Sequence, residues 1–407
     1  MFIPGSKTEY SSRSLIMNFE GVSPLNEKSK VALVSCSSYD EPAVAEAVKR
    51  GLALIGGMDT FIHPGEKIVL KPNILVGDAP DKVISPHPLV FKAVAESAKT
   101  VTTNLTYGDS PGFGKPIGQM MKAQYCQVAN DLAIPLADFE NGKEVHYPDS
   151  PFTTQFVLAN GVLEAEGLIS LSKFKTHQLT RMTGPIKNQF GCIPGTLKAE
   201  YHIKLPNALD FAKMLVCLTL YIRPRLYIVD GIIAMEGNGP RGGTPVKMNA
   251  LLFSKDPVAL EAVMCRLIDL NPNFVPTIKP GQDWGLGTAR PEEIELVGDP
   301  LVPFINKNFK VVRAPVKPVT DTTFVPFVRN LIVPRPVIDP VLCNQCGTCV
   351  HHCPASPKAV DWHDGDRAKV PTYKYSRCIR CFCCQELCPQ LAISVRTPLL
   401  GRLLESL

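Results

Sequence analysis

The sequence lacks the apolar runs that membrane insertion and secretion require. Its longest apolar stretch, residues 214–222, has nine residues, one of which is Thr219, whereas a membrane-spanning helix needs about 20. The first residues, MFIPGSKTEY, contain no apolar core of the kind found in a secretory signal. We therefore expect a cytoplasmic protein with no membrane span and with thiols that stay reduced.

The net charge is also small: 43 Lys and Arg against 38 Asp and Glu leave a formal net charge of only +5. Proteins that bind nucleic acid neutralise many phosphates, and no basic motif interleaved with aromatic residues is present here. We expect no nucleic-acid partner. With 45% hydrophobic and 20% charged residues, the chain is typical of a folded globular protein, not of a disordered chain, coiled coil or collagen-like repeat.

Cysteine is rare in the first 342 residues, which hold five, and abundant in the last 65, which hold nine. Eight of these nine form two runs with the spacing C-x2-C-x2-C-x3-C-P, the bacterial pattern for [4Fe–4S] clusters. In this pattern the fourth cysteine of each run ligates the cluster of the other run. The expected ligands are therefore Cys343, Cys346, Cys349 and Cys388 for one cluster, and Cys378, Cys381, Cys384 and Cys353 for the other.

The alternative for these runs is a zinc ribbon, which also uses pairs of cysteines. Two four-cysteine runs of identical spacing, each closed by proline, fit zinc poorly. Cys383 lies outside the register and is either a bystander or a hydrogen-bonded thiol near the second cluster. Two adjacent clusters favour the transfer of single electrons as the task of this module.

Short apolar runs alternate with helical patterns between residues 31 and 300. This order predicts an α/β domain with a largely parallel sheet flanked by helices, whose ligands bind at the carboxyl ends of the strands. The expected strands are Val31–Ser35, Lys67–Lys71, Asn104–Tyr107, Ala133–Ala137, Leu168–Leu171, Arg225–Val229, Ala250–Phe253 and Glu293–Val297. The expected helices are Pro42–Leu54, Pro88–Ala98, Ile117–Asn130, Ala208–Leu220 and Pro257–Ile268, the last capped by Asp256.

The composition divides the chain into five parts. We expect residues 1–30 to form a polar N-terminal arm, residues 31–300 to form the α/β domain, and residues 301–335 to form a connector. The connector lies in a proline-rich region, since eight prolines lie between positions 300 and 340. Residues 336–395 form a small α+β ferredoxin-like domain with two clusters. Residues 396–407 are a tail, and we expect its LLGRLLESL to form a short amphipathic helix that packs against the protein.

The strongest candidate for a ligand site follows the expected strand Leu168–Leu171. Residues 171–204 hold six Lys or Arg and one acid, which suits a carboxylate or phosphate ligand. Lys175, Lys187 and Asn188 are candidates to contact it, and His177 is a candidate proton carrier near neutral pH. A solvated basic face or a docking surface for an acidic redox partner stays open as the alternative.

Three more strand ends add candidates. The loop Gly108–Gly118 can aim backbone amides at an anion, with Asp109 and Ser110 as side-chain contacts, but it has neither Walker A nor dinucleotide-binding spacing. Lys71 and Asn73 follow another strand. In the glycine-rich segment 230–243, Asp230 and Glu236 are candidate bases or ligands of a hard metal. A structural turn or a mobile loop is the competing interpretation for these segments, and His63 and His87 are given no role.

Together these segments resemble the domain-of-unknown-function family numbered 362, whose members often carry a ferredoxin tail. The resemblance rests on KPN (71–73), HP (87–88), GDSPGFG (108–114), SKFKTHQLTRMTGPIKNQFG (172–191), DGIIAMEGNGPRGG (230–243) and DPVALEAV (256–263). It implies one α/β unit fused to a ferredoxin module and supplies no substrate. The family's last motif ends in aspartate where this chain has Glu261, so that position is assigned no role.

Two functions follow from these observations. The first is an oxidoreductase in which two [4Fe–4S] clusters relay single electrons to a small anionic substrate or cofactor in the α/β domain, where Lys175, His177, Asp230 and Glu236 act on charge and protons. The second is a non-catalytic electron carrier, or a reductive activation partner of another enzyme. No nicotinamide or nucleotide fingerprint is present; a flavin is compatible with the anion loops but is not indicated.

Overall fold

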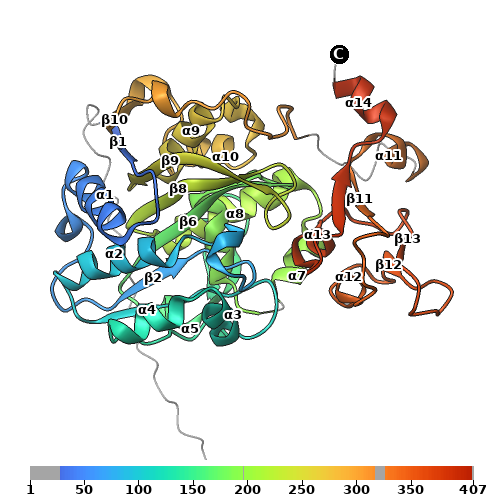
Figure 1. Cartoon of the computed structure of the whole chain (residues 1–407), viewed down its shortest axis with the longest axis horizontal. Helices are drawn as coiled ribbons and strands as arrows, with labels where there is room; N and C mark the ends of the chain where they lie inside the picture. The colour runs from blue at the N-terminus through green and yellow to red at the C-terminus, as the bar shows by residue number, and fades with distance from the viewer. Residues whose placement is uncertain (1–27, 196, 317–325, 406–407) are drawn as a thin grey trace, which may run out of the picture.

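The computed structural model describes residues 28–195, 197–316 and 326–405. Its centre is an eight-stranded sheet in the order β10-β1-β9-β8-β6-β2-β3, with β7 beside β6 (Figure 1). These strands are β1 (Ser29–Ser35), β2 (Ile68–Pro72), β3 (Leu105–Tyr107), β6 (Gly167–His177), β7 (Arg181–Thr183), β8 (Leu226–Glu236), β9 (Thr244–Ser254) and β10 (Ile294–Gly298). The pairs β1–β10, β2–β3, β2–β6 and β6–β8 are parallel, and β1–β9, β8–β9 and β6–β7 are antiparallel.

Helices cover both faces of this sheet because its strands are apolar on both sides. In β1, Val31 and Leu33 pack into one core while Ala32 and Val34 pack into the other, as the two-residue period of a strand requires. One face carries α1 (Glu41–Leu54), α2 (Pro88–Lys99), α3 (Pro116–Lys122) and α4 (Tyr125–Asp131). The other carries α6 (Pro185–Asn188), α8 (Ala208–Ile222), α9 (Pro257–Leu267) and α10 (Ile278–Asp283).

Four expected helices are confirmed by α1, α2, α8 and α9. Asp256 caps α9 as expected, its Oδ1 accepting from the amides of Val258 and Ala259, each at 2.9 Å. The single helix expected over Ile117–Asn130 is wrong, because Gln124 takes a left-handed conformation (φ 63°) that separates α3 from α4.

The expected strand over Ala133–Ala137 is also wrong, because only Leu136 pairs there, in one isolated bridge to Tyr107. The larger difference concerns the ends of two strands. β6 continues through residue 177 and β8 through residue 236, where β8 forms an antiparallel pair with β9. Lys175, His177 and Asp230 therefore lie within strands and not in loops beyond them.

Two further segments complete the α/β domain. β4 (Gly142–His146) and β5 (Gln155–Ala159) form a hairpin outside the main sheet, a pairing that the sequence analysis did not predict. Near them lie the short helices α5 (Asn160–Leu163) and α7 (Leu197–Lys204).

The C-terminal residues fold into a small α+β unit beside α7 (Figure 1). Its strands are β11 (Arg335–Ile338), β12 (Val360–Asp361), β13 (Thr372–Tyr373) and β14 (Ile393–Arg396), paired antiparallel as β11–β14 and β12–β13. Its helices are α12 (Thr348–His351) and α13 (Cys383–Leu387), with α11 (Pro326–Ile332) before and α14 (Leu399–Glu405) after the unit. The expected α/β and α+β folds are thus both present.

Parts of three expected segments lie outside the described residues: most of the N-terminal arm 1–30, the centre of the connector 301–335, and the last two residues of the tail 396–407. Within the described part of the tail, residues Leu399–Glu405 form the helix α14. Gly401 of α14 lies so close to α11 that a Cβ there would be 2.2 Å from the carbonyl oxygen of Ile332. None of the helices in the described part of the chain combines the length and apolar character that a bilayer span requires.

Candidate functional site

A cavity of about 340 Å³ lies between the α/β domain and the C-terminal unit. On the α/β side its walls come from residues 73–75 after β2, 109–112 after β3, 187–195 in and after α6, and 198–202 in α7. On the other side they come from residues 351–354 and 383–387. Parallel β2 and β3 end at one edge of the sheet, so the loops that follow them meet there, and the C-terminal unit closes the space.

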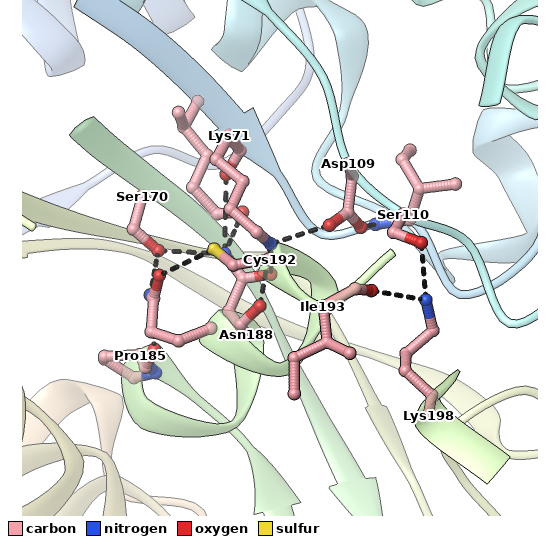
Figure 2. Close-up of polar contacts among 12 residues, drawn as sticks. Lys71, Asp109, Ser110, Ser170, Pro185, Asn188, Cys192, Ile193 and Lys198 are labelled. Carbon is pink, nitrogen blue, oxygen red and sulfur yellow. Dashed lines mark hydrogen bonds and ion pairs between the residues drawn. The ribbon is translucent and has the colours of Figure 1, made fainter. Parts of the chain in front are cut away.

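A buried ion pair between Lys71 and Asp109, the second of which lines the cavity, lies next to it (Figure 2). Lys71 Nζ lies 2.7 Å from Asp109 Oδ1, and both side chains are almost fully buried. Lys71 Nζ also donates to the backbone oxygen of Asn188 at 2.7 Å and to its Oδ1 at 3.1 Å, while Asp109 Oδ2 accepts from the amide of Ile74 at 2.6 Å. The pair therefore ties the ends of β2 and β3 to α6.

Gly191 is required by this pair. A Cβ at that position would lie 1.9 Å from Asp109 Oδ1 and 2.9 Å from Lys71 Nζ, closer than any side-chain carbon can approach. The carbonyl oxygen of Gly191 in turn accepts from the amide of Ser110 at 3.0 Å. The glycine thus lets the segment after α6 lie directly against the loop after β3.

A second buried lysine lies beside the first pair. Lys198 Nζ donates to Ser110 Oγ at 2.5 Å and to the carbonyl oxygen of Ile193 at 3.0 Å. Ser110 Oγ also accepts from the amide of Gly195 at 2.9 Å. Burial lowers the pKa of Lys198 to about 7, since an ammonium group loses solvation there.

Lys187 also lines the cavity, and its ammonium group has no hydrogen bond among the described residues. Its Nζ lies 4.8 Å from the ring centroid of Phe190 and 5.8 Å from that of Phe211, so aromatic faces hold it in place. Burial lowers its pKa. His202 stacks on Phe211 at 4.7 Å, and burial lowers the pKa of this histidine to about 4, so it is neutral at pH 7.

The C-terminal unit is docked by polar contacts around the cavity. Glu386 Oε1 lies 3.2 Å from His177 Nε2 at the end of β6. The ring's other nitrogen accepts from the amides of Leu179 at 3.1 Å and Thr180 at 3.4 Å. The hydrogen of His177 is therefore on Nε2, directed at Glu386.

The glycine-rich segment 237–243 provides the rest of this docking. Arg241 binds both carboxylate oxygens of Asp78, at 2.9 and 3.2 Å, and donates to the carbonyl oxygen of Leu387 at 3.0 Å. Gln385 Nε2 donates to the carbonyl oxygen of Asn238 at 2.8 Å. This segment, expected to be a mobile loop or a ligand loop, holds the C-terminal unit against the sheet.

The structure brings most of the expected ligand-binding residues together. Asn73, Asp109, Ser110, Lys187 and Asn188 all line the cavity. The sixth, at position 71, forms the ion pair beneath it. The four expected catalytic residues are not among the lining residues. Two of them lie in the extended part of β6: Lys175 donates to the carbonyl oxygen of Ile84 at 2.6 Å, and His177 makes the docking contact.

The other two are held elsewhere. Asp230 forms an ion pair with Lys173 at 2.8 Å and accepts from the hydroxyl of Tyr39 at 2.9 Å and the amide of His87 at 2.8 Å. His87, which was given no role, stacks on Tyr39 at 4.0 Å and belongs to this buried cluster. Glu236 accepts from the amide of Lys310 at 2.9 Å and so fastens the connector.

Three residues of the site were missed by the sequence analysis: Lys198, His202 and Glu386. The first two lie in the basic segment 171–204, where their position after α6 was the available signal. Glu386 lies inside the second cysteine run, where the spacing predicts a role only for the cysteines. Its contact with His177 joins residues that are 209 positions apart, and no local pattern indicates such a pairing.

Six of the nine C-terminal cysteines line one of two cavities. A small cavity is lined by Cys343, Cys346 and Cys349 together with Cys388 of the other run. This set of four thiols fits a cluster whose ligands cross between the runs. Cys353 instead lines the interdomain cavity, as does Cys383, the cysteine outside the register.

Comparisons with known proteins agree with the two-part fold. A family model described as a domain of unknown function (DUF362) matches residues 68–266, and a 4Fe-4S dicluster domain model matches residues 335–389. The thylakoid-associated protein sll1697 of Synechocystis sp. is 34% identical over 263 residues, which cover 64% of this chain and 81% of that protein. The chain belongs to the DUF362 family. The resemblance seen in its motifs is thereby confirmed.

Solved structures also resemble part of this DUF362 protein. The lactate racemase apoprotein from Thermoanaerobacterium thermosaccharolyticum matches with a TM-score of 0.38 and 14% sequence identity. The match covers 60% of this chain and 57% of that chain. The dicluster match at residues 335–389 supports iron–sulfur binding by the C-terminal unit of the DUF362 protein.

Proposed function

We propose that this protein is an iron–sulfur oxidoreductase in which two [4Fe–4S] clusters pass single electrons to a small anionic ligand in the interdomain cavity. One observation carries the proposal: the same cavity is lined by Lys187, a cation without a hydrogen bond among the described residues, and by Cys353, an expected cluster ligand. A ligand bound to that cation would lie beside the cluster of the second cysteine run.

The crossed ligand sets are part of this proposal. Cys388 lines one small cavity with three cysteines of the first run, which supports its assignment to the first cluster. By the same pattern Cys353 joins Cys378, Cys381 and Cys384 at the second cluster. When bound, the clusters act as one-electron carriers. The polypeptide supplies the ligand site and holds it at a fixed distance from the clusters.

The walls of the cavity indicate what ligand it takes. Lys187 attracts an anionic group, and the ring of Phe190 limits where the ammonium can move. Asn73 Oδ1 is a buried acceptor without a hydrogen-bond partner in the described part of the chain, so it favours a ligand that also carries a donor. A volume of about 340 Å³ suits a small organic acid with a hydroxyl or amino group.

A second function, that of an electron carrier or reductive activation partner for another protein, is favoured by an exposed part of the C-terminal unit. Cys346 is exposed there, and the neighbouring apolar side chains Val341 and Leu342 are 89% and 54% exposed. Exposed apolar residues beside a cluster suit a redox partner protein. In the first function this face receives electrons; in the second it also delivers them.

The test begins with anaerobic purification and iron and sulfide analysis, for which we expect about eight of each per chain. Reduced protein is then mixed with inorganic phosphate and a panel of small hydroxy and amino acids while EPR spectra are recorded. We expect one ligand to alter the spectrum of one cluster, and Lys187→Met to abolish that change. Lys213→Met is the matched control, because Lys213 also lies over a phenyl ring, at 5.1 Å, but on an exposed helix face.

Zinc in place of iron would contradict the cluster assignment. A cluster-loaded protein whose spectra respond to no ligand in the panel would favour the electron-carrier function. A response that survives Lys187→Met would place the ligand outside the interdomain cavity.

A further inference from the structure

Lys198 is a buried cation with no carboxylate partner. Its side chain is bonded only to neutral oxygens, Ser110 Oγ at 2.5 Å and the carbonyl oxygen of Ile193 at 3.0 Å, and among the described residues it forms no ion pair. An ammonium held this way is stabilised less than one paired with a carboxylate, since the desolvation cost is only partly offset. Lys198 can therefore lose and regain a proton inside the protein.

Ser110 connects this lysine to the ligand. Its oxygen accepts from Lys198 Nζ at 2.5 Å and from the amide of Gly195 at 2.9 Å, which occupies both lone pairs. The hydroxyl hydrogen must then point away from both donors, and no acceptor for it occurs within the described residues. Ser110 and Lys198 both line the cavity, so a bound ligand can be that acceptor.

We propose that Lys198 takes up one proton when the cluster beside the cavity is reduced, and that Ser110 passes a proton to the ligand when the electron leaves. This inference rests on the proposed function. A one-electron carrier protein supplies the electron, and solvent supplies the proton that converts the Lys198 amine to an ammonium. When the ligand accepts the electron, the Ser110 hydroxyl hydrogen goes to the ligand and one hydrogen of the ammonium goes to Ser110 Oγ.

The charges around Lys198 are consistent with a titration near neutral pH. Burial lowers its pKa to about 7; the Asp109 carboxylate and the thiol of Cys192 oppose this shift, whereas the cations of Lys71 and Lys187 add to it. The ring of His202 lies on the same helix and is neutral at pH 7. Reduction adds a negative charge beside the cavity, which raises the pKa of Lys198 and draws a proton onto it.

The experiment is a potentiometric titration of the cluster-loaded protein at pH values from 6 to 9, followed by EPR. We expect the potential of one cluster to fall as pH rises from about 7, because protonation of Lys198 favours the reduced state. In Lys198→Met this dependence is lost. Lys204→Met is the matched control, since Lys204 lies on the same helix with a side chain 70% exposed, and it should keep the wild-type dependence.

Ser110→Ala provides a second test that does not require removal of the lysine. Without the hydroxyl acceptor the Lys198 ammonium is less stable, so the pH range over which the cluster potential changes should move down by about one pH unit. Potentials that are independent of pH in a protein with both clusters would overturn this proposal and leave the proposed function standing. A dependence that Lys198→Met retains would overturn it too, by placing the proton on another group. A protein without clusters would overturn the proposed function, and this inference with it.

Discussion

The Lys71–Asp109 pair allows a quantitative prediction, because two charges 2.7 Å apart lie almost entirely out of solvent. Asp109→Asn keeps the shape of the side chain but leaves the Lys71 cation without its counter-ion. Removing one partner of a buried pair costs about 3–5 kcal/mol of unfolding free energy. Asn188 still offers two acceptors to Lys71, at 2.7 and 3.1 Å, so we expect a loss near the lower end, about 3 kcal/mol.

The assay is urea denaturation of the four cluster-loaded proteins of a double-mutant cycle, followed by circular dichroism under anaerobic conditions. Lys71→Met alone should also destabilise the protein, whereas the double variant leaves no unpaired charge and should lose less than the sum of the two. We expect a coupling of about 2 kcal/mol. Contributions that do not involve the pair, including those of the C-terminal unit, cancel in the cycle.

A surface pair provides the control. Lys279 and Asp283 are also 2.7 Å apart, but their side chains are 77% and 45% exposed. Asp283→Asn should therefore change the unfolding free energy by less than about 1 kcal/mol. Additive losses at Lys71 and Asp109, within about 0.5 kcal/mol, would refute the argument that burial makes this pair interdependent.

Three further predictions concern other contacts. In Cys388→Ser the cluster that changes in EPR should be that of the first cysteine run, and loss of the second cluster alone would contradict crossed ligation. Since His202 has a folded pKa of about 4, below that of an unfolded histidine, its contribution to stability falls as pH decreases below about 6.5. Between pH 7 and pH 5 this effect should lower the free energy of unfolding, measured by urea denaturation, by about 2 kcal/mol, and His202→Phe should abolish that loss. An unchanged pH dependence in the variant would argue against a neutral buried ring. Arg241→Met removes the contacts with Asp78 and Leu387 and should speed hydrogen exchange in α13, whereas unaltered exchange would mean that the remaining contacts suffice for docking.

The layered fold could be predicted because its strands and helices follow local patterns. The alternation in β1 and the cap on α9 are both visible in a few consecutive residues. The true ends of β6 and β8 were not predictable in this way. Lys173, Lys175 and Asp230 are charged, and charged residues usually indicate the end of a buried strand. Here each is paired or hydrogen-bonded inside the protein, so the strands continue.

The candidate site shows the same limit. Position at a strand end was enough to find Asp109 and Ser110, since parallel strands deliver their following loops to one place. The position in the sequence did not show that Lys187 lines the cavity whereas His177, only ten residues earlier, contacts the C-terminal unit. That distinction depends on the docked unit, and the docking contacts join residues far apart in the chain.

The docking of the C-terminal unit has a consequence for kinetics. The connector is fastened to the α/β domain at Glu236, and the unit itself is held by Arg241 and His177. In the proposed function, electron donor and acceptor site therefore meet without diffusion, and the internal transfer is a first-order step whose rate does not change on dilution. In that function only the arrival of electrons from outside would depend on concentration, so turnover in dilute solution would report on the encounter with the external donor.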